Sequence, residues 1–99
     1  MRKTIRRRRI ERAVAALTEI RGVDMAFVEY DPVGEEGHRW SLTANTRTGE
    51  KTVLCRNLAE CEAGVEELRR ICIEESRLSD AECEAIVDRA LRPRDRRAC

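Results

Sequence analysis

The sequence predicts an α+β fold, in which helices pack on a three-stranded antiparallel meander sheet in the order α-β-β-β-α-α. Apolar residues recur at helical spacing near both ends of the chain, and they alternate with polar residues in the middle. A chain of 99 residues is long enough for one small domain. We therefore assign 1–92 to a single domain that begins with an Arg-rich helix, and 93–99 to a disordered basic tail.

The first predicted helix covers about 3–21 and ends before Gly22, a residue that tolerates the left-handed backbone at a helix end. Its apolar residues follow the spacing of a helix that buries one stripe. These residues are Ile10, Ala13, Val14, Leu17 and Ile20.

Three strands are predicted in the segment with alternating apolar residues, at about 23–30, 38–44 and 51–55. Met25 and Phe27 share one face of the first strand, and Trp40 and Leu42 share one face of the second. We expect Phe27, Trp40 and Leu42 to lie in the core or in a dimer interface, and we favour this for Trp40 over a role as a ligand platform. A tight loop is expected at 45–49, with Gly49 available for positive φ.

Two further helices are predicted from their capping residues. Asn57 is followed by Glu60, and Ser79 is followed by Glu82, which is the spacing of a capping box. Gly64 inside the second helix indicates close packing against the sheet, because glycine otherwise weakens a helix. The third helix is expected to bury a stripe formed by Cys83, Ile86, Val87, Ala90 and Leu91.

The five cysteines do not indicate a metal or disulfide framework, since their number is odd and none are in Cys-x-x-Cys spacing. We expect reduced thiols, with Cys61, Cys72 and Cys83 acting as small buried hydrophobes. Cys99 is expected to be exposed in the tail, and whether it forms an intermolecular disulfide is left open.

No catalytic constellation is evident. His38 is the single histidine, and no sequence signal links it to Cys55 or Ser41 as a base for a nucleophile. We therefore predict a protein that is not an enzyme, without catalytic residues, metal ligands, a cofactor or a small-molecule substrate.

Charge is strongly segregated along the chain, although the net formal charge is only +1. Residues 1–12 contain seven basic residues and one acidic residue, whereas 13–91 contain 9 basic and 17 acidic residues. The predicted contact residues for nucleic-acid phosphates or another partner are Arg6, Arg7, Arg8, Arg9 and Arg12. A solvated helix end that pairs with an acidic partner subunit is the alternative.

The second predicted helix is expected to present an acidic face formed by Glu62, Glu66 and Glu67. Such a face is most simply solvated, and a sharper interpretation is that it docks on a basic protein groove.

Three segments resemble the YegP-like family of small domains of uncharacterised function. They are Phe27-x-x-Tyr30, Arg39-Trp40-x-Leu42-x-Ala44 with Gly49 at the following turn, and Gly64-Val65-Glu66-x-Leu68-Arg69. The resemblance covers about 25–69. It implies a three-stranded antiparallel sheet crossed by a helix, and a homodimer, but it supplies no catalytic residues.

The sequence thus predicts a small interaction module, homodimeric and cytoplasmic, that contacts nucleic acid or a nucleoprotein complex. No apolar run is long enough for a membrane span, and the basic start lacks the apolar stretch of a secretory signal, so we expect no membrane contact. The alternative is a phage-encoded inhibitor, similar to an anti-CRISPR protein, that blocks a host defence complex through protein contacts. The sequence does not identify the partner, any sequence preference or the host.

Overall fold

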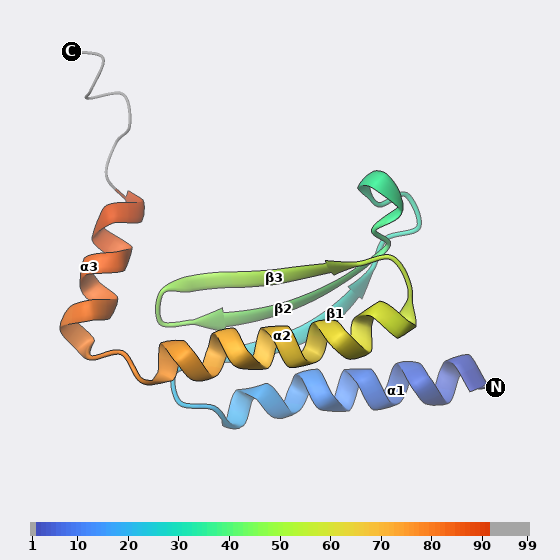
Figure 1. The fold of residues 1–99 in the computed structure, drawn as a ribbon, viewed down its shortest axis with the longest axis horizontal. Helices are drawn as coiled ribbons and strands as arrows, with labels where there is room; N and C mark the ends of the chain where they lie inside the picture. The colour runs from blue at the N-terminus through green and yellow to red at the C-terminus, as the bar shows by residue number, and fades with distance from the viewer. Residues whose placement is uncertain (1, 92–99) are drawn as a thin grey trace, which may run out of the picture.

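The computed structural model describes residues 2–91, and it confirms the α+β fold and the order α-β-β-β-α-α (Figure 1). The predicted tail at 93–99, including Cys99, lies outside the described residues. The regular elements are α1 (Arg2–Ala15), β1 (Met25–Tyr30), β2 (Trp40–Thr46), β3 (Gly49–Cys55), α2 (Leu58–Ser76) and α3 (Asp80–Leu91), with short 3₁₀ turns at Ala16–Glu19 and Glu35–Gly37.

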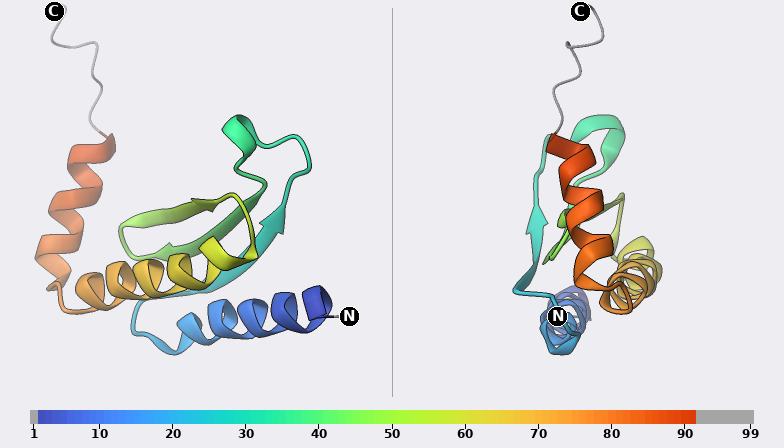
Figure 2. Two further views of the ribbon diagram at one scale, coloured as in Figure 1. Left: turned by 45° about the vertical axis from the view of Figure 1, so that its right-hand side comes forward. Right: turned by 90° about the vertical axis from the view of Figure 1, so that its left-hand side faces the viewer.

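The fold has two layers, a sheet of strand order β1-β2-β3 and a layer formed by α1 and α2 (Figure 2). The two helices lie side by side on one face of the sheet, with α2 against β2 and β3 and α1 against β1. The core between the layers is formed by Ile10, Val14, Leu17, Val23, Leu42, Ala44, Cys55, Cys61, Val65, Leu68 and Cys72.

Both strand pairs are antiparallel, and their register decides which side chains face the helices. Val28 pairs with Leu42, which is fully buried, whereas Phe27 pairs with Thr43. Because neighbours in register point to the same face, Phe27 lies on the face away from the helices and outside the core. Of the two positions predicted for Phe27, the core is thus excluded, and the dimer interface stays a prediction. Both alternating sets of β1 contain apolar residues, so the pattern of this strand did not reveal which set faces inward.

The predicted hairpin turn is confirmed, since Thr46 pairs with Gly49 and Gly49 has φ of 119°. The first helix is shorter than predicted. It is α-helical to Ala15 and continues as a 3₁₀ turn before Gly22, which has φ of 90°.

Gly64 determines how closely α2 approaches the sheet. A Cβ atom at this position would lie 3.0 Å from Cys55 Sγ, 3.0 Å from Leu42 Cδ1 and 3.2 Å from Val53 Cγ1. Leu42 and Cys55 are fully buried and have little room to move. The close packing that the glycine predicts is therefore present.

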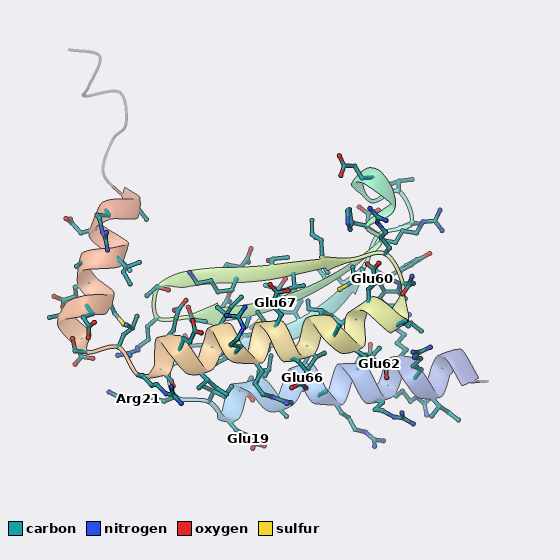
Figure 3. All side chains as sticks on the ribbon, in the orientation of Figure 1. Glu19, Arg21, Glu60, Glu62, Glu66 and Glu67 are labelled. Carbon is teal, nitrogen blue, oxygen red and sulfur yellow. The ribbon has the colours of Figure 1, made fainter. Side chains whose placement is uncertain are left out.

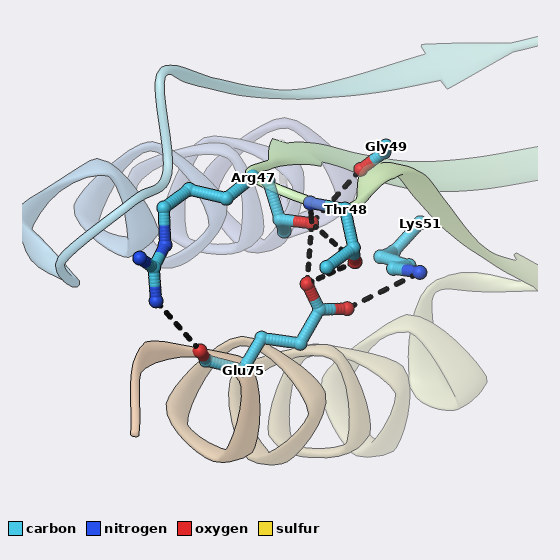
Figure 4. Close-up of polar contacts among 6 residues, drawn as sticks. Arg47, Thr48, Gly49, Lys51 and Glu75 are labelled. Carbon is cyan, nitrogen blue, oxygen red and sulfur yellow. Dashed lines mark hydrogen bonds and ion pairs between the residues drawn. The ribbon is translucent and has the colours of Figure 1, made fainter. Parts of the chain in front are cut away.

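The C-terminal end of α2 is tied to the β2–β3 hairpin by Arg47 (Figure 4). Its guanidinium donates to the carbonyl oxygens of Glu75, at 3.3 Å, and Leu78, at 2.8 Å, and it pairs with Asp80 at 2.9 Å. Arg47 thus ties the hairpin to the last turn of α2 and to the connection with α3, where the Glu75 carbonyl also accepts the Leu78 N–H at 3.1 Å.

The Glu75 carboxylate forms the second link between α2 and the hairpin (Figure 4). It accepts hydrogen bonds from the hydroxyls of Thr46, at 2.7 Å, and Thr48, and it pairs with Lys51 at 3.2 Å. Burial by itself raises the pKa of Glu75. The hydrogen bonds from Thr48, Thr46 and Lys51, together with the charge of Lys51, outweigh burial and hold the pKa below its ordinary value.

The helix α3 projects away from the two layers (Figures 1 and 2). Its predicted capping box is confirmed, because the Glu82 N–H donates to Ser79 Oγ at 3.1 Å and the Ser79 N–H donates to Glu82 Oε1 at 3.0 Å. Among the described side chains of the predicted buried stripe, Cys83 alone is buried. The rest are half-buried or exposed: Ile86, Val87 and Ala90. That prediction is corrected, because α3 does not lie across the sheet.

Replacing Gly64 by valine is expected to lower the free energy of unfolding by roughly 1–3 kcal/mol, because the added methyl groups overpack the contact with the sheet. Helix propensity by itself favours valine over glycine and opposes this loss. Urea unfolding followed by circular dichroism measures the change, with Ala63→Val on the exposed side of α2 as control. Equal losses of stability in the two variants would contradict the prediction that the contact between Gly64 and the sheet has no room for a side chain.

Replacing Glu75 by glutamine is expected to cost about 1–3 kcal/mol of stability at pH 7. Since the folded pKa lies below the ordinary value of 4.5, this contribution is fully present above pH 4.5 and is lost as the pH falls through the folded pKa. Unfolding curves between pH 7 and pH 3 should therefore converge for the two proteins. Glu74→Gln is the control, because Glu74 is an exposed partner of Arg70 and should change stability by less than about 1 kcal/mol. Parallel pH profiles for wild type and Glu75→Gln would contradict the role of this carboxylate.

Candidate functional site

The arginines of α1 fall on two sides of the helix. Successive residues of an α-helix are about 100° apart, so Arg6 and Arg7 flank the stripe that buries Ile10 and Val14. Three others lie on the opposite, outer side and are exposed: Arg8, Arg9 and Arg12. The structure therefore does not bring the five arginines predicted from the sequence into one site.

A pocket of about 550 Å³ opens where Arg6 and Arg7 approach the end of the sheet. We call it the Arg–Trp pocket. Its lining residues come from α1, β1, the start of β2 and the segment between β3 and α2, and they are Arg6, Arg7, Tyr30, Arg39, Trp40, Arg56, Asn57, Leu58 and Ala59. The pocket thus combines four guanidinium groups with two aromatic rings and the first turn of α2.

Trp40 and Tyr30 form the aromatic wall of the Arg–Trp pocket. They are paired across β1 and β2, and their ring centroids are 4.7 Å apart at an interplanar angle of 55°. The guanidinium carbon of Arg7 lies 5.1 Å from the centroid of the Trp40 ring, which is the geometry of a cation–π contact. Trp40 also packs against the buried core, so this side chain connects the core with the pocket.

Two of the four pocket arginines have carboxylate partners. Arg6 Nε donates to Glu62 Oε1 at 2.9 Å, and Arg7 Nε donates to Glu11 Oε2 at 3.4 Å. Arg39 and Arg56 are exposed and have no ion-pair partner among the side chains that the structure describes. Glu60 adds a third carboxylate at the pocket, because it accepts the Arg56 N–H at 2.8 Å, so four guanidinium groups and three carboxylates leave a formal local charge of +1.

The start of α2 places Arg56 at the pocket. The strand β3 ends at Cys55, and Asn57 already caps α2, because the Glu60 N–H donates to Asn57 Oδ1 at 2.9 Å. The Arg56 N–H donates in turn to Glu60 Oε1 at 2.8 Å, and these reciprocal bonds satisfy the start of the helix. Arg56 is the single residue between strand and cap, so its position is fixed from both sides.

The connection between β1 and β2 places Arg39 at the same end of the sheet. The Asp31 N–H donates to the Arg39 carbonyl at 2.6 Å, which closes the connection between β1 and β2. Trp40 pairs with Tyr30 on one side and with Cys55 on the other. The end of β1, the start of β2 and the end of β3 therefore lie side by side at this end of the sheet.

Arg39, Arg56 and Tyr30 are pocket residues that the sequence analysis missed. Their signal is present in the sequence, because Arg39 precedes β2 and Arg56 follows β3, and antiparallel pairing brings these two ends together. Recognising it requires the strand boundaries and the register to the exact residue, which alternating apolar residues do not supply.

The predicted acidic residues of α2 do not form one continuous acidic face (Figure 3). Glu62 and Glu67 are about 140° apart around the helix. Each of the three predicted residues also pairs with an arginine of this chain: Glu62 with Arg6, Glu66 with Arg69 at 2.9 Å, and Glu67 with Arg70 at 4.0 Å. Each of the three carboxylates therefore already has a basic partner within the chain.

The four described cysteines are buried free thiols: Cys55, Cys61, Cys72 and Cys83. Cys55 and Cys61 are in side-chain hydrogen-bond contact. Burial raises the pKa of Cys55 and Cys72, and burial together with the neighbouring Cys55 raises the pKa of Cys61 to about 12. Thiolates, which bind metals and attack electrophiles, are therefore disfavoured. Within residues 2–91, no group of three or more His, Cys, Asp or Glu side chains is placed to hold a metal ion.

Comparison of this chain with family models, curated proteins and solved structures finds no match. The resemblance to the YegP-like family stays a prediction. No helix in the described part of the chain is long and apolar enough to cross a membrane.

The buried thiols are expected to react slowly with a maleimide at pH 8, at least about 100-fold more slowly in the folded protein than in urea, because they are buried and protonated. The measurement uses a Cys99→Ser variant, so that only the four described thiols contribute. Rapid labelling of any of the four in the folded protein would contradict the burial of that thiol.

Proposed function

We propose that this protein is a non-enzymatic interaction module that binds the phosphate backbone of nucleic acid, with the outer side of α1 as its main contact. One observation carries the proposal. Arg8, Arg9 and Arg12 are exposed together on the side of α1 that faces away from the sheet, and none has an ion-pair partner among the described side chains.

The electrostatics of α1 favour an anionic partner. The first turn of the helix contains no acidic residue, although the helix dipole places partial positive charge there. The neighbouring arginines also repel each other. A phosphate chain bound along α1 places negative charge near the positive end of the helix dipole and reduces the repulsion between the arginines. Because its binding releases counterions, the affinity depends strongly on salt concentration.

The expected binding is indifferent to base sequence. Trp40 and Tyr30 line the Arg–Trp pocket and are absent from the outer side of α1, so the outer arginines have no aromatic neighbour for base stacking. Contacts to phosphates position a protein on nucleic acid without reporting its sequence.

Docking on a basic protein surface is less well supported, because the predicted acidic residues Glu62, Glu66 and Glu67 are each paired with an arginine of the same chain. The inhibitor alternative therefore lacks a specific observation in its favour. The homodimer remains part of the proposal. The uncovered face of the sheet is the surface we assign to it, since Met25 and Leu54 are 55% and 56% exposed there.

Replacing Arg8, Arg9 and Arg12 together by alanine is expected to weaken binding to duplex or single-stranded nucleic acid by at least tenfold at low salt. The slope of log affinity against log salt concentration should become shallower by about 2–3, because each phosphate contact contributes roughly one unit. Fluorescence anisotropy with a labelled oligonucleotide at several salt concentrations measures both quantities.

The matched control removes three exposed arginines from the other end of the molecule, Arg21, Arg77 and Arg89. This control has the same net charge as the α1 variant and is expected to change affinity by less than about threefold. Absence of binding by the wild-type protein at low salt, or equal losses in both triple variants, would overturn the proposed function.

A further inference from the structure

The Arg–Trp pocket has the charge to hold an anionic group. Its four guanidinium groups exceed the three carboxylates beside them by one. Arg39 and Arg56 are the pocket arginines whose guanidinium groups pair with no described carboxylate. Guanidinium groups bind phosphate oxygens through paired N–H donors, so two or more arginines around one phosphate give both affinity and orientation.

The backbone of α2 adds donors to the same pocket. Leu58 and Ala59 line it and belong to the first turn of a helix of 19 residues. N–H groups in the first turn precede the intrahelical bonding pattern, and Asn57 Oδ1 accepts the N–H of Glu60 rather than theirs. These donors reinforce the arginines at a site that the cavity and the four guanidinium groups already define.

The size and the wall of the pocket indicate a ligand larger than inorganic phosphate. A volume of about 550 Å³ lies within the range of pockets that hold small organic ligands. Trp40, Tyr30 and Leu58 supply an apolar and aromatic surface beside the arginines. A planar ring or another apolar group attached to the phosphate can pack there.

The position of the pocket favours a terminal phosphate over a phosphodiester inside a strand. The pocket lies on the side of α1 that faces the sheet, whereas Arg8, Arg9 and Arg12 lie on the opposite side. A continuous strand bound along the outer side of α1 does not pass through the pocket. A phosphomonoester also offers three acceptor oxygens to the guanidinium groups, whereas a phosphodiester has two that are not esterified.

We infer that the Arg–Trp pocket binds a phosphomonoester attached to a planar or apolar group. Two sources share this chemistry, the phosphorylated end of a nucleic-acid strand and a free mononucleotide. The strand-end form rests on the proposed function. The pocket itself depends on Arg39, Arg56 and Trp40. The proposed contacts between the outer side of α1 and a nucleic-acid backbone do not involve these three residues.

Trp40 provides a direct readout, because it is the single tryptophan of the chain and lines the pocket. The full-length protein is titrated with adenosine 5′-monophosphate, with adenosine and with inorganic phosphate, while tryptophan fluorescence is recorded. The monophosphate is expected to bind at least tenfold more tightly than either of the other two. Equal responses to adenosine and its monophosphate, or no response to the monophosphate, would overturn the inference.

The Arg39→Ala/Arg56→Ala variant is expected to weaken binding of the monophosphate by at least tenfold. Both side chains are exposed, so the variant should retain the circular dichroism spectrum of the wild type. Arg39→Lys/Arg56→Lys retains the charge and loses the guanidinium geometry, and it should show an intermediate affinity. The control Arg21→Ala/Arg77→Ala removes two exposed arginines elsewhere and should change affinity by less than twofold. A loss in this control equal to that of the pocket variant would contradict a specific site.

A second arm distinguishes the two sources and separates the inference from the proposed function. A single-stranded oligonucleotide is compared with and without a 5′-phosphate in the wild type and in the pocket variant. A gain of tenfold from the phosphate that disappears in Arg39→Ala/Arg56→Ala identifies a strand end. Binding of the free monophosphate without such a gain identifies a mononucleotide. Salt-dependent binding of the unphosphorylated strand reports the outer side of α1 alone, so each hypothesis can fail independently of the other.

Discussion

The close contact between Gly64 and the sheet is the constraint on which the rest of the structure depends. The absence of a side chain at Gly64 lets α2 lie directly on Leu42, Val53 and Cys55. Only Arg56 and Asn57 separate the last residue of β3 from the first residue of α2. The segment in between has no freedom to move away from the sheet, and this places Arg56 beside the residues at the start of β2.

The same packing separates the arginines of α1 into two functional sets. Ile10 and Val14 must face α2 and the sheet to be buried, so the positions of all other residues on the helix follow from its geometry. Arg6 and Arg7 come to lie at the edge of the core, where Glu62 and Trp40 contact them. Arg8, Arg9 and Arg12 are directed to solvent. One helix thus contributes to a pocket on one side and to a basic surface on the other.

Local signals in the sequence were sufficient for the elements and their caps. The capping residues Asn57 and Ser79 act within three residues of the groups that they satisfy, so their bonds can be predicted without a tertiary structure. The stripe of α3 was misplaced, and the sequence could not choose between the core and a dimer interface for Phe27. An apolar residue indicates that a surface can be buried, but it does not specify what covers that surface. In the structure, the helices cover the other face of β1, and α3 projects beyond the sheet.

The sequence by itself determined the α+β class, the order of the elements, the close approach at Gly64 and the concentration of arginine in α1. These features depend on spacing over a few residues or on composition. The tertiary structure alone decided which arginines converge, because Arg6, Arg39 and Arg56 are brought together by strand register and by the packing of α1 beside α2. It also decided that Glu62 is paired with Arg6, since this contact joins residues 56 positions apart in the chain.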